Sequence, residues 1–327
     1  MDAFVAAAPE LLILVPLAVA AGIDLYLTLL FLGAIPTTAW WGGPLPGALS
    51  DLDSISVMLV VGGFYLLEFS AERFPTASLI WNAFHAVIRP LSGALLALLL
   101  LDGQAPAVIV AGAIASGVLV SAAHAIRSGA SILRWLSWKP APHPVLPSLG
   151  EDAVVLGLVA LVVDQPEWAL AGGLLIAVIG SIGGASRVRA FGFAVRLATG
   201  RIFKTLGARR WTDTEGFPTW VRDALKGDVM APGGGLRGSS VAAHQLEGAP
   251  PFATGWLVVT GDAPVFVFRK GTKTCLVDLE GLKAVDIVET GFFRRIDLSA
   301  AAGTGACIFF GAGGPSTESL RAEFFFA

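Results

Sequence analysis

The chain has 327 residues, of which 55% are hydrophobic and only 14% charged, and its mean hydropathy is +0.73. A soluble domain typically has about 25% charged residues, so this composition excludes an ordinary soluble protein. The charge is also uneven, because residues 1–186 hold five Lys and Arg against twelve Asp and Glu, whereas residues 187–327 hold seventeen against thirteen. We therefore predict an apolar membrane part followed by a polar part.

Six apolar segments approach the roughly 20 residues that a helix needs to cross a bilayer core. They cover residues 11–33, 54–71, 78–101, 106–128, 151–164 and 168–186. No Lys or Arg precedes Arg73, so the basic region of a signal peptide is missing, and we expect the first segment to remain as a membrane helix. The sequence thus predicts an α-helical membrane bundle of about six transmembrane helices, over residues 1–190.

The basic residues of this part indicate its orientation, because Lys and Arg gather in cytoplasmic loops. They follow the second, fourth and sixth segments, and the loops after the first, third and fifth have none. The residues concerned are Arg73, Arg127, Arg134, Lys139, Arg187 and Arg189. We therefore predict that both termini and the loop 129–150 are cytoplasmic.

Residues 191–235 connect the two parts. Residues 191–206 place Phe, Val, Leu and Ile among Arg196, Arg201 and Lys204. This pattern is typical of a basic amphipathic helix on the inner membrane surface, and equally of a helix packed on the following domain. The glycine-rich stretch 232–235 then reads as a linker.

Residues 236–327 form the expected third region, which is rich in strands. Residues 256–260 and 265–268 flank a turn at 261–264 and predict a hairpin, and further short apolar runs follow at 273–279, 284–288 and 306–310. Residues 316–325 predict a closing helix. Both cysteines of the chain, Cys275 and Cys307, lie here, either as a disulfide or as two reduced, buried thiols. We expect a small barrel or sandwich.

The membrane part resembles a bacterial membrane-protein family catalogued only as a domain of unknown function, number 4126. The resemblance covers about residues 10–185 and implies no established activity. It rests on residues 22–28 (GIDLYLT), 65–69 (YLLEF), 81–85 (WNAFH), 89–90 (RP), and on Ser148 with Glu151 and Asp152. The resemblance implies a bacterial protein, so we expect the membrane to be the bacterial cytoplasmic (inner) membrane.

The last region, about 236–325, looks like a bacterial pleckstrin-homology-like domain. The residues that carry this likeness are 255–260 (GWLVVT), before an apolar hairpin strand that ends in Arg269. The resemblance implies a bent seven-stranded sheet capped by one helix, on the cytoplasmic side. Such domains often bind lipids or proteins, but a fold alone does not determine which.

Ionisable and polar residues inside the apolar segments are the candidate functional residues, because each is costly there unless it is paired or hydrated. Helical spacing of three and four puts several of them on shared faces. The candidates for an intramembrane polar network or pathway are Asp24, Tyr65, Glu68, Glu72, Asn82, His85, Arg89, His124, Arg127, Glu151 and Asp152.

Charge balance predicts two sets of ion pairs among these residues. Arg89 is expected to pair with Glu68 or Glu72, and Arg127 with Glu151 or Asp152. If the pairs only fix the packing of the helices, the network is structural. If Asp24, Glu68, His85 and Arg89 line a polar pathway, His85 beside a carboxylate is suited to relay protons, because histidine titrates near neutral pH.

Signatures of common enzymes are missing from the sequence, which has no HExxH, Walker loop or GxSxG, so we expect no enzyme activity, no cofactor and no metal. The sequence favours a small inner-membrane transporter or channel, with a cytoplasmic domain that regulates or anchors it. The alternatives are a non-transporting scaffold or lipid-binding protein, and an intramembrane enzyme. The expected partners are membrane lipids, with an ion or small polar solute and a second copy of the chain as further candidates, and no nucleic acid.

Overall fold

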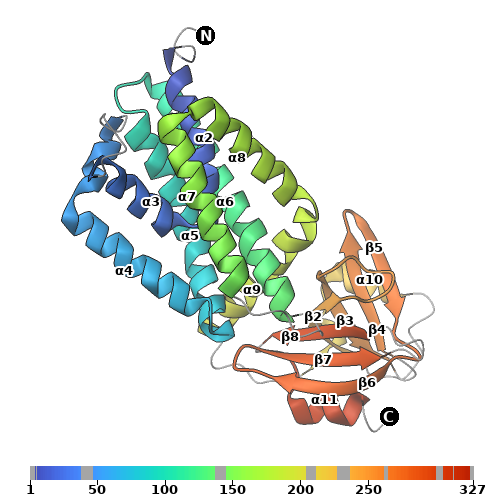
Figure 1. Ribbon diagram of the computed structural model, residues 1–327. Helices are drawn as coiled ribbons and strands as arrows, with labels where there is room; N and C mark the ends of the chain where they lie inside the picture. Colours follow the sequence, from blue (N-terminus) through green and yellow to red (C-terminus); the bar gives the residue numbers. More distant parts are fainter. Residues whose placement is uncertain are drawn as a thin grey trace. The chain divides into compact units, whose positions relative to one another are not determined.

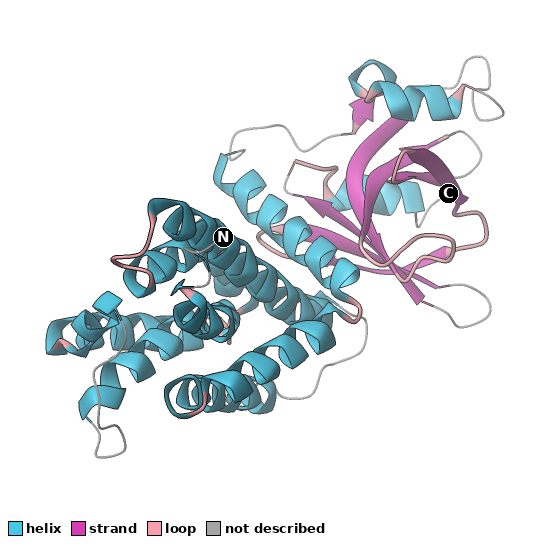
Figure 2. Cartoon of the chain, turned by 90° about the horizontal axis from the view of Figure 1, so that it is seen from above, coloured by secondary structure: helices cyan, strands magenta, loops and turns pink. Residues whose placement is uncertain are grey.

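The computed structural model describes residues 4, 6–37, 47–136, 145–203, 211–226, 236–260, 264–299, 305–311 and 313–324. The chain divides into two compact units, Met1–Phe191 and Gly192–Ala327. Figure 2 shows that the strands, drawn in magenta, all belong to the second unit, whereas the described first unit is helical. The predicted linker at 232–235 and residues 261–263 of the predicted turn 261–264 lie outside the described residues.

The first unit is built from a series of apolar helices (Figure 1). Its helices are α2 (Ala8–Ile23), α3 (Leu25–Ala34), α4 (Ile55–Ala71), α5 (Pro75–Leu100), α6 (Pro106–Leu136), α7 (Val145–Asp164) and α8 (Pro166–Ser181), with short 3-10 turns at Ile35–Thr37 and Gly47–Asp53; α9 (Gly184–Phe203) crosses into the second unit. Helix α2 is central, because it packs against α5, α6, α7 and α8 and residues 16–23 are all buried.

Two of the described helices are long and apolar enough to cross a membrane: Ala77–Leu100 within α5 and Pro106–Arg134 within α6. The pair α8 and α9 counts as a third candidate if it is one span bent by 76° at the break between them. Helices α2, α3 and α4 are apolar but shorter. The structure thus supports two to three spanning helices by length and composition, and the predicted number of six is not confirmed.

The first apolar segment differs from the prediction of one continuous helix. It is divided at Asp24, whose backbone is extended (φ −138°, ψ 105°), so that α2 ends at Ile23 and α3 begins at Leu25. The Asp24 carboxylate accepts a hydrogen bond of 2.9 Å from the backbone N–H of Leu27, which makes Asp24 the N-cap of α3. Asp24 therefore does not lie inside a helix, as expected, but at a break.

Two further boundaries were predicted incorrectly. Helix α7 starts at Val145, six residues before the predicted segment at 151, so part of the expected loop 129–150 is helical; α6 likewise extends to Leu136. Residues 191–203 of the expected amphipathic helix at 191–206 belong to α9, and residues 204–206 lie outside the described residues. Phe193 of α9 lies 6.0 Å from Phe252 and 5.8 Å from Phe309, ring centre to ring centre, so this helix packs on the sheet of its own unit.

The second unit is an antiparallel sheet with a closing helix, as predicted in outline. Its strands follow the order β5-β4-β3-β2-β8-β7-β6, and β1 pairs with β2. The strands are β1 (Thr212–Asp213), β2 (Arg237–His244), β3 (Ala253–Val259), β4 (Pro264–Lys270), β5 (Lys273–Asp278), β6 (Lys283–Glu289), β7 (Phe293–Ser299) and β8 (Gly305–Gly311); the helices are α10 (Thr219–Leu225) and α11 (Thr317–Phe324). The sheet has eight described strands rather than seven, because of the short β1.

The predicted hairpin is confirmed as β3 and β4, which pair with Leu257 opposite Phe266. Strands β2 and β7 were not predicted. Strand β6 is irregular between Ala284 and Asp286, where its register with β7 shifts. Of the two alternatives for Cys275 and Cys307, a disulfide or two reduced thiols, the structure has free thiols. The topology is compatible with the pleckstrin-homology-like expectation but does not by itself confirm that family.

Candidate functional site

The break between α2 and α3 is stabilised by Arg89 from α5. Carbonyl groups in the last turn of a helix have no donor within the helix. The Nη1 group of Arg89 donates to two of these, the carbonyl oxygens of Ala21 and Gly22, the latter at 3.1 Å. Arg89 is fully buried, and its Nη2 group donates to Glu68 Oε1 at 2.7 Å. One guanidinium therefore joins the broken helix to α4.

A second arginine, Arg127 of α6, forms ion pairs with three carboxylates. Its Nη1 lies 2.6 Å from Glu72 Oε1 and 3.4 Å from Glu68 Oε1, and its Nε lies 2.7 Å from Glu151 Oε2. Both predicted sets of ion pairs are thus confirmed, Arg89 with Glu68 and Arg127 with Glu151. Arg127 was expected near a helix end, but its side chain is only 9% exposed and lies inside the long helix α6.

His85 forms a short hydrogen-bonded chain beside this cluster. Its Nδ1 lies 2.9 Å from the carbonyl oxygen of Trp81, and its Nε2 lies 3.0 Å from the hydroxyl of Tyr26. A carbonyl can only accept, so Nδ1 carries the hydrogen and, in the neutral ring, the Tyr26 hydroxyl donates to Nε2. Tyr26 was not among the predicted candidates, although its position two residues after Asp24 was a usable signal.

Three further candidates, His124, Tyr65 and Asp152, make hydrogen bonds or ring contacts beside this cluster. The rings of His124 and His85 are 6.1 Å apart, and His124 Nδ1 is 3.2 Å from Ser128 Oγ. Tyr65 donates to Asp152 Oδ2 at 3.1 Å, which links α4 to α7.

Asn82 does not join the cluster. Its amide nitrogen lies 2.8 Å from the carbonyl oxygen of Ser78, one turn earlier in its own helix. Of the three candidates at helical spacing on α5, Asn82, His85 and Arg89, only the last two thus contact the segment around the helix break.

The cluster carries an excess of negative charge. Glu68, Glu72 and Glu151 contact the two guanidinium groups directly, and Asp24 and Asp152 interact electrostatically with Arg127. If all five carboxyls are ionised, five negative charges face two positive ones, a formal charge of −3. Of these acids, Glu72, Glu151 and Asp152 are partly exposed, and Asp24 caps α3.

The cluster also extends from the surface into the unit. The side chains of Glu72 and Glu151 are 27% and 26% exposed, whereas that of Glu68 is 3% exposed. Arg127 contacts all three. The described residues therefore form a continuous series of charged contacts from a partly exposed rim to the buried break in the first segment.

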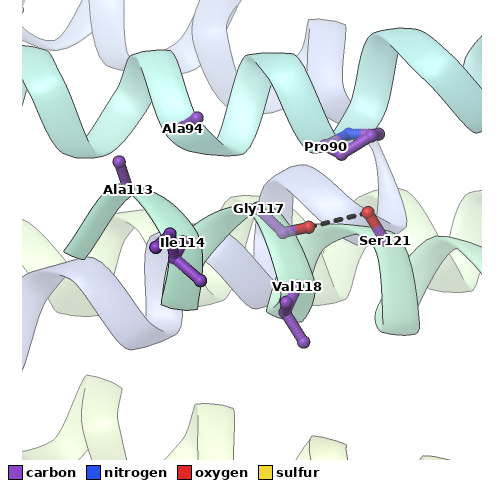
Figure 3. Close-up of a pocket in the computed structure, with 7 residues that line it drawn as sticks. All are labelled: Pro90, Ala94, Ala113, Ile114, Gly117, Val118 and Ser121. Atoms are coloured by element: carbon purple, nitrogen blue, oxygen red, sulfur yellow. Dashed lines mark hydrogen bonds between the residues drawn. The ribbon is translucent and has the colours of Figure 1, made fainter. Parts of the chain in front are cut away.

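A separate hollow of about 440 Å³ lies between α5 and α6 (Figure 3). Its lining is apolar apart from Ser121, whose hydroxyl donates to the carbonyl oxygen of Gly117 at 2.7 Å. The lining residues are Pro90, Ala94, Ala113, Ile114, Gly117, Val118 and Ser121. No charged side chain lines the hollow, so it is not part of the polar cluster. Among the described residues, no group of three or more His, Cys, Asp or Glu is placed to hold a metal ion.

Comparison with protein families gives one match, to the family described as "Domain of unknown function (DUF4126)", over residues 11–183. This range covers slightly more than half of the chain and includes every residue of the polar cluster. Among curated proteins and among solved structures, no match is found.

Proposed function

We propose that this chain, which belongs to the family described as Domain of unknown function (DUF4126), is a small transporter or channel of the bacterial inner membrane. The observation that carries the proposal is the charged cluster at the helix break, with five carboxyls against two guanidinium groups. Ionisable groups within a membrane are costly and tend to mark pathways for ions or protons. The second unit is proposed to be a cytoplasmic, pleckstrin-homology-like domain that regulates or anchors the first.

The broken first segment supports this proposal. Interrupted helices near the middle of the membrane are a recurring feature of transporters, because the free ends of the backbone bind ions and polar groups there. In this chain the break lies between α2 and α3 at Asp24, with the carbonyl oxygens of Ala21 and Gly22 bound by Arg89 and the N–H of Leu27 bound by Asp24. The negative side chain at the N-terminus of α3 is also favourable for the helix dipole.

Six spans, with both termini in the cytoplasm, remain the proposed topology. The basis is the restriction of Lys and Arg to alternate connections. It requires the short helices α2, α3 and α4 to contribute to spans, together with the longer α5 and α6. Labelling of single introduced cysteines from outside the cell tests the topology, since position 103 is expected to react and position 73 is not.

The scaffold alternative is favoured by one observation, the dense pairing of the deep residues. Arg89 is fully buried and has three acceptors, so it is not a side chain that lines an open channel. We therefore assign Arg89 a positioning role and place the pathway at the carboxyls. His85 also ends a hydrogen-bonded chain at the Trp81 carbonyl, which has no proton to pass on.

Flux through proteoliposomes tests the proposal. The purified protein is reconstituted, and the uptake of protons, alkali cations and small anions is compared for the wild type, Glu68→Gln and Glu167→Gln. Glu167 is an exposed acid in the first turn of α8 and serves as the matched control. Uptake that is lost in Glu68→Gln but kept in the control supports transport. A folded wild type that moves none of these solutes contradicts it and favours the scaffold.

A further inference from the structure

The one residue of helix α4 whose side chain is almost fully buried is Glu68. Four of the helix's large apolar side chains, Ile55, Leu59, Leu66 and Leu67, are more than half exposed, whereas Val61 and Tyr65 are partly buried against the core of the unit. Val61, Tyr65 and Glu68 lie at helical spacing, so the face of α4 that packs on the core is apolar apart from this acid. Burial of an acid is unfavourable unless the acid is paired, and Arg89 pairs with only one of the two oxygens of Glu68.

The two oxygens of this carboxyl are in different surroundings. Oε1 accepts from Arg89 at 2.7 Å and lies 3.4 Å from Arg127, whereas Oε2 is buried and has no hydrogen-bond partner among the described residues. A carboxylate can accept about four hydrogen bonds, and a buried oxygen without any is costly. A proton bound to Oε2 would remove the negative charge, and Oε1 would still accept from Arg89.

Glu68 contacts two arginines directly and has several further acids around it. The charged and titratable groups that face it are Arg89 from α5, Arg127 from α6, Asp24 at the helix break, Tyr26 from α3, and Tyr65 and Glu72 from α4 itself, and Glu151 from α7 shares Arg127 with it. Acids outnumber bases in this set. Metal ions such as Ca²⁺ need several oxygen ligands at once, but a proton needs only one oxygen.

We propose that the ligand of this site is a proton, bound at Oε2 of Glu68, and that the proton is the ion that the pathway carries. This inference rests on the proposed transport function for its second half only. The proton adds to the carboxylate to give the neutral acid, and no other bond is made or broken. Glu72 and Glu151, whose side chains are 27% and 26% exposed, share Arg127 with Glu68.

Infrared difference spectroscopy of the full-length protein tests the binding of the proton. Films of the protein in lipid are perfused with buffers of decreasing pH, and the C=O stretch of protonated carboxyls is recorded in H₂O and in D₂O. We expect a band that grows on acidification, shifts in D₂O, is lost in Glu68→Gln and persists in Glu167→Gln. If Glu68→Gln does not fold, Glu68→Asp keeps a carboxyl at the site, and its band is expected at a shifted frequency.

A band that is unchanged in Glu68→Gln, or unshifted in Glu68→Asp, would overturn the inference. A second measurement, with a pH-sensitive dye trapped in proteoliposomes, separates the inference from the transport proposal. The band together with Glu68-dependent proton flux supports both. The band without flux of any solute supports the proton site and overturns its role in transport. Flux of another ion without the band overturns the proton site and leaves transport intact.

Discussion

Replacement of Arg89 by alanine is expected to be among the most destabilising single changes in the helical unit. The side chain is fully buried and donates to Glu68 and to the carbonyl oxygens of Ala21 and Gly22. Removal of one partner from a buried ion pair typically costs about 3–5 kcal/mol. Each carbonyl that loses its donor adds about 1–3 kcal/mol, while the remaining contact of Glu68 with Arg127 at 3.4 Å reduces the total.

A double-mutant cycle separates these contributions. The free energy of unfolding is measured in detergent for Arg89→Ala, Glu68→Ala and the double variant. The double variant is expected to recover part of the loss, because no carboxylate is left unpaired, but not the part due to the helix break. Arg73→Ala is the matched control, since Arg73 is an exposed arginine that lies 4.0 Å over the ring of Phe69. A loss no larger than in this control, or strictly additive single losses, would refute the reasoning.

Three further outcomes are expected. Burial lowers the pKa of His244, so below its ordinary value of about 6.5 the unfolded chain binds a proton that the folded chain does not, and the free energy of unfolding of the second unit should fall as the pH falls; His244→Gln should flatten that dependence in pH-dependent melts. Burial and a neighbouring carboxylate raise the pKa of the Cys307 thiol to about 12, so a maleimide should label the half-buried Cys275 first and Cys307 only after unfolding. Gly129→Ala should lower the melting temperature, because its Cβ would lie 2.0 Å from a backbone oxygen at the start of α9, whereas Gly157→Ala, at an open helical position, should not.

The members of the polar cluster could be predicted from the sequence because the physical argument is local. An acid or base within an apolar segment requires a partner, and few partners were available for Arg89 and Arg127. That argument gave Glu68 or Glu72 for Arg89 and Glu151 or Asp152 for Arg127, and the structure has Glu68 and Glu151. It did not predict that one arginine would bind three carboxylates, because this depends on how three helices pack.

The break at Asp24 could not be predicted from the length and hydropathy of the first segment. These properties favour one continuous helix, and a single aspartate does not outweigh them. The break depends on Arg89, which supplies donors to the carbonyl groups of Ala21 and Gly22 and lies more than sixty residues away in the sequence. Local patterns contain no information on such a contact.

Strand β7 was missed for a different reason. Three of its seven residues are charged, which is unusual for a strand in the middle of a sheet. Arg294 is nevertheless buried, because it donates to the carbonyl oxygens of Gly314 and Pro315, and Asp297 lies 2.8 Å from Arg295. The charges are balanced by partners that a search for apolar runs does not consider.

The irregular strand β6 affects how the second unit behaves in solution. Strands β5 and β6 end the sheet, and each has one side on which no described strand pairs with it. Such edges are templates for the addition of strands from other molecules. The shift in register between Ala284 and Asp286, together with the exposed charges of Lys283 and Asp286, makes β6 a poor template for such addition. Lys273 and Asp278 likewise place exposed charges at both ends of β5. The unit is thereby protected from edge-to-edge aggregation when it is held at high local concentration.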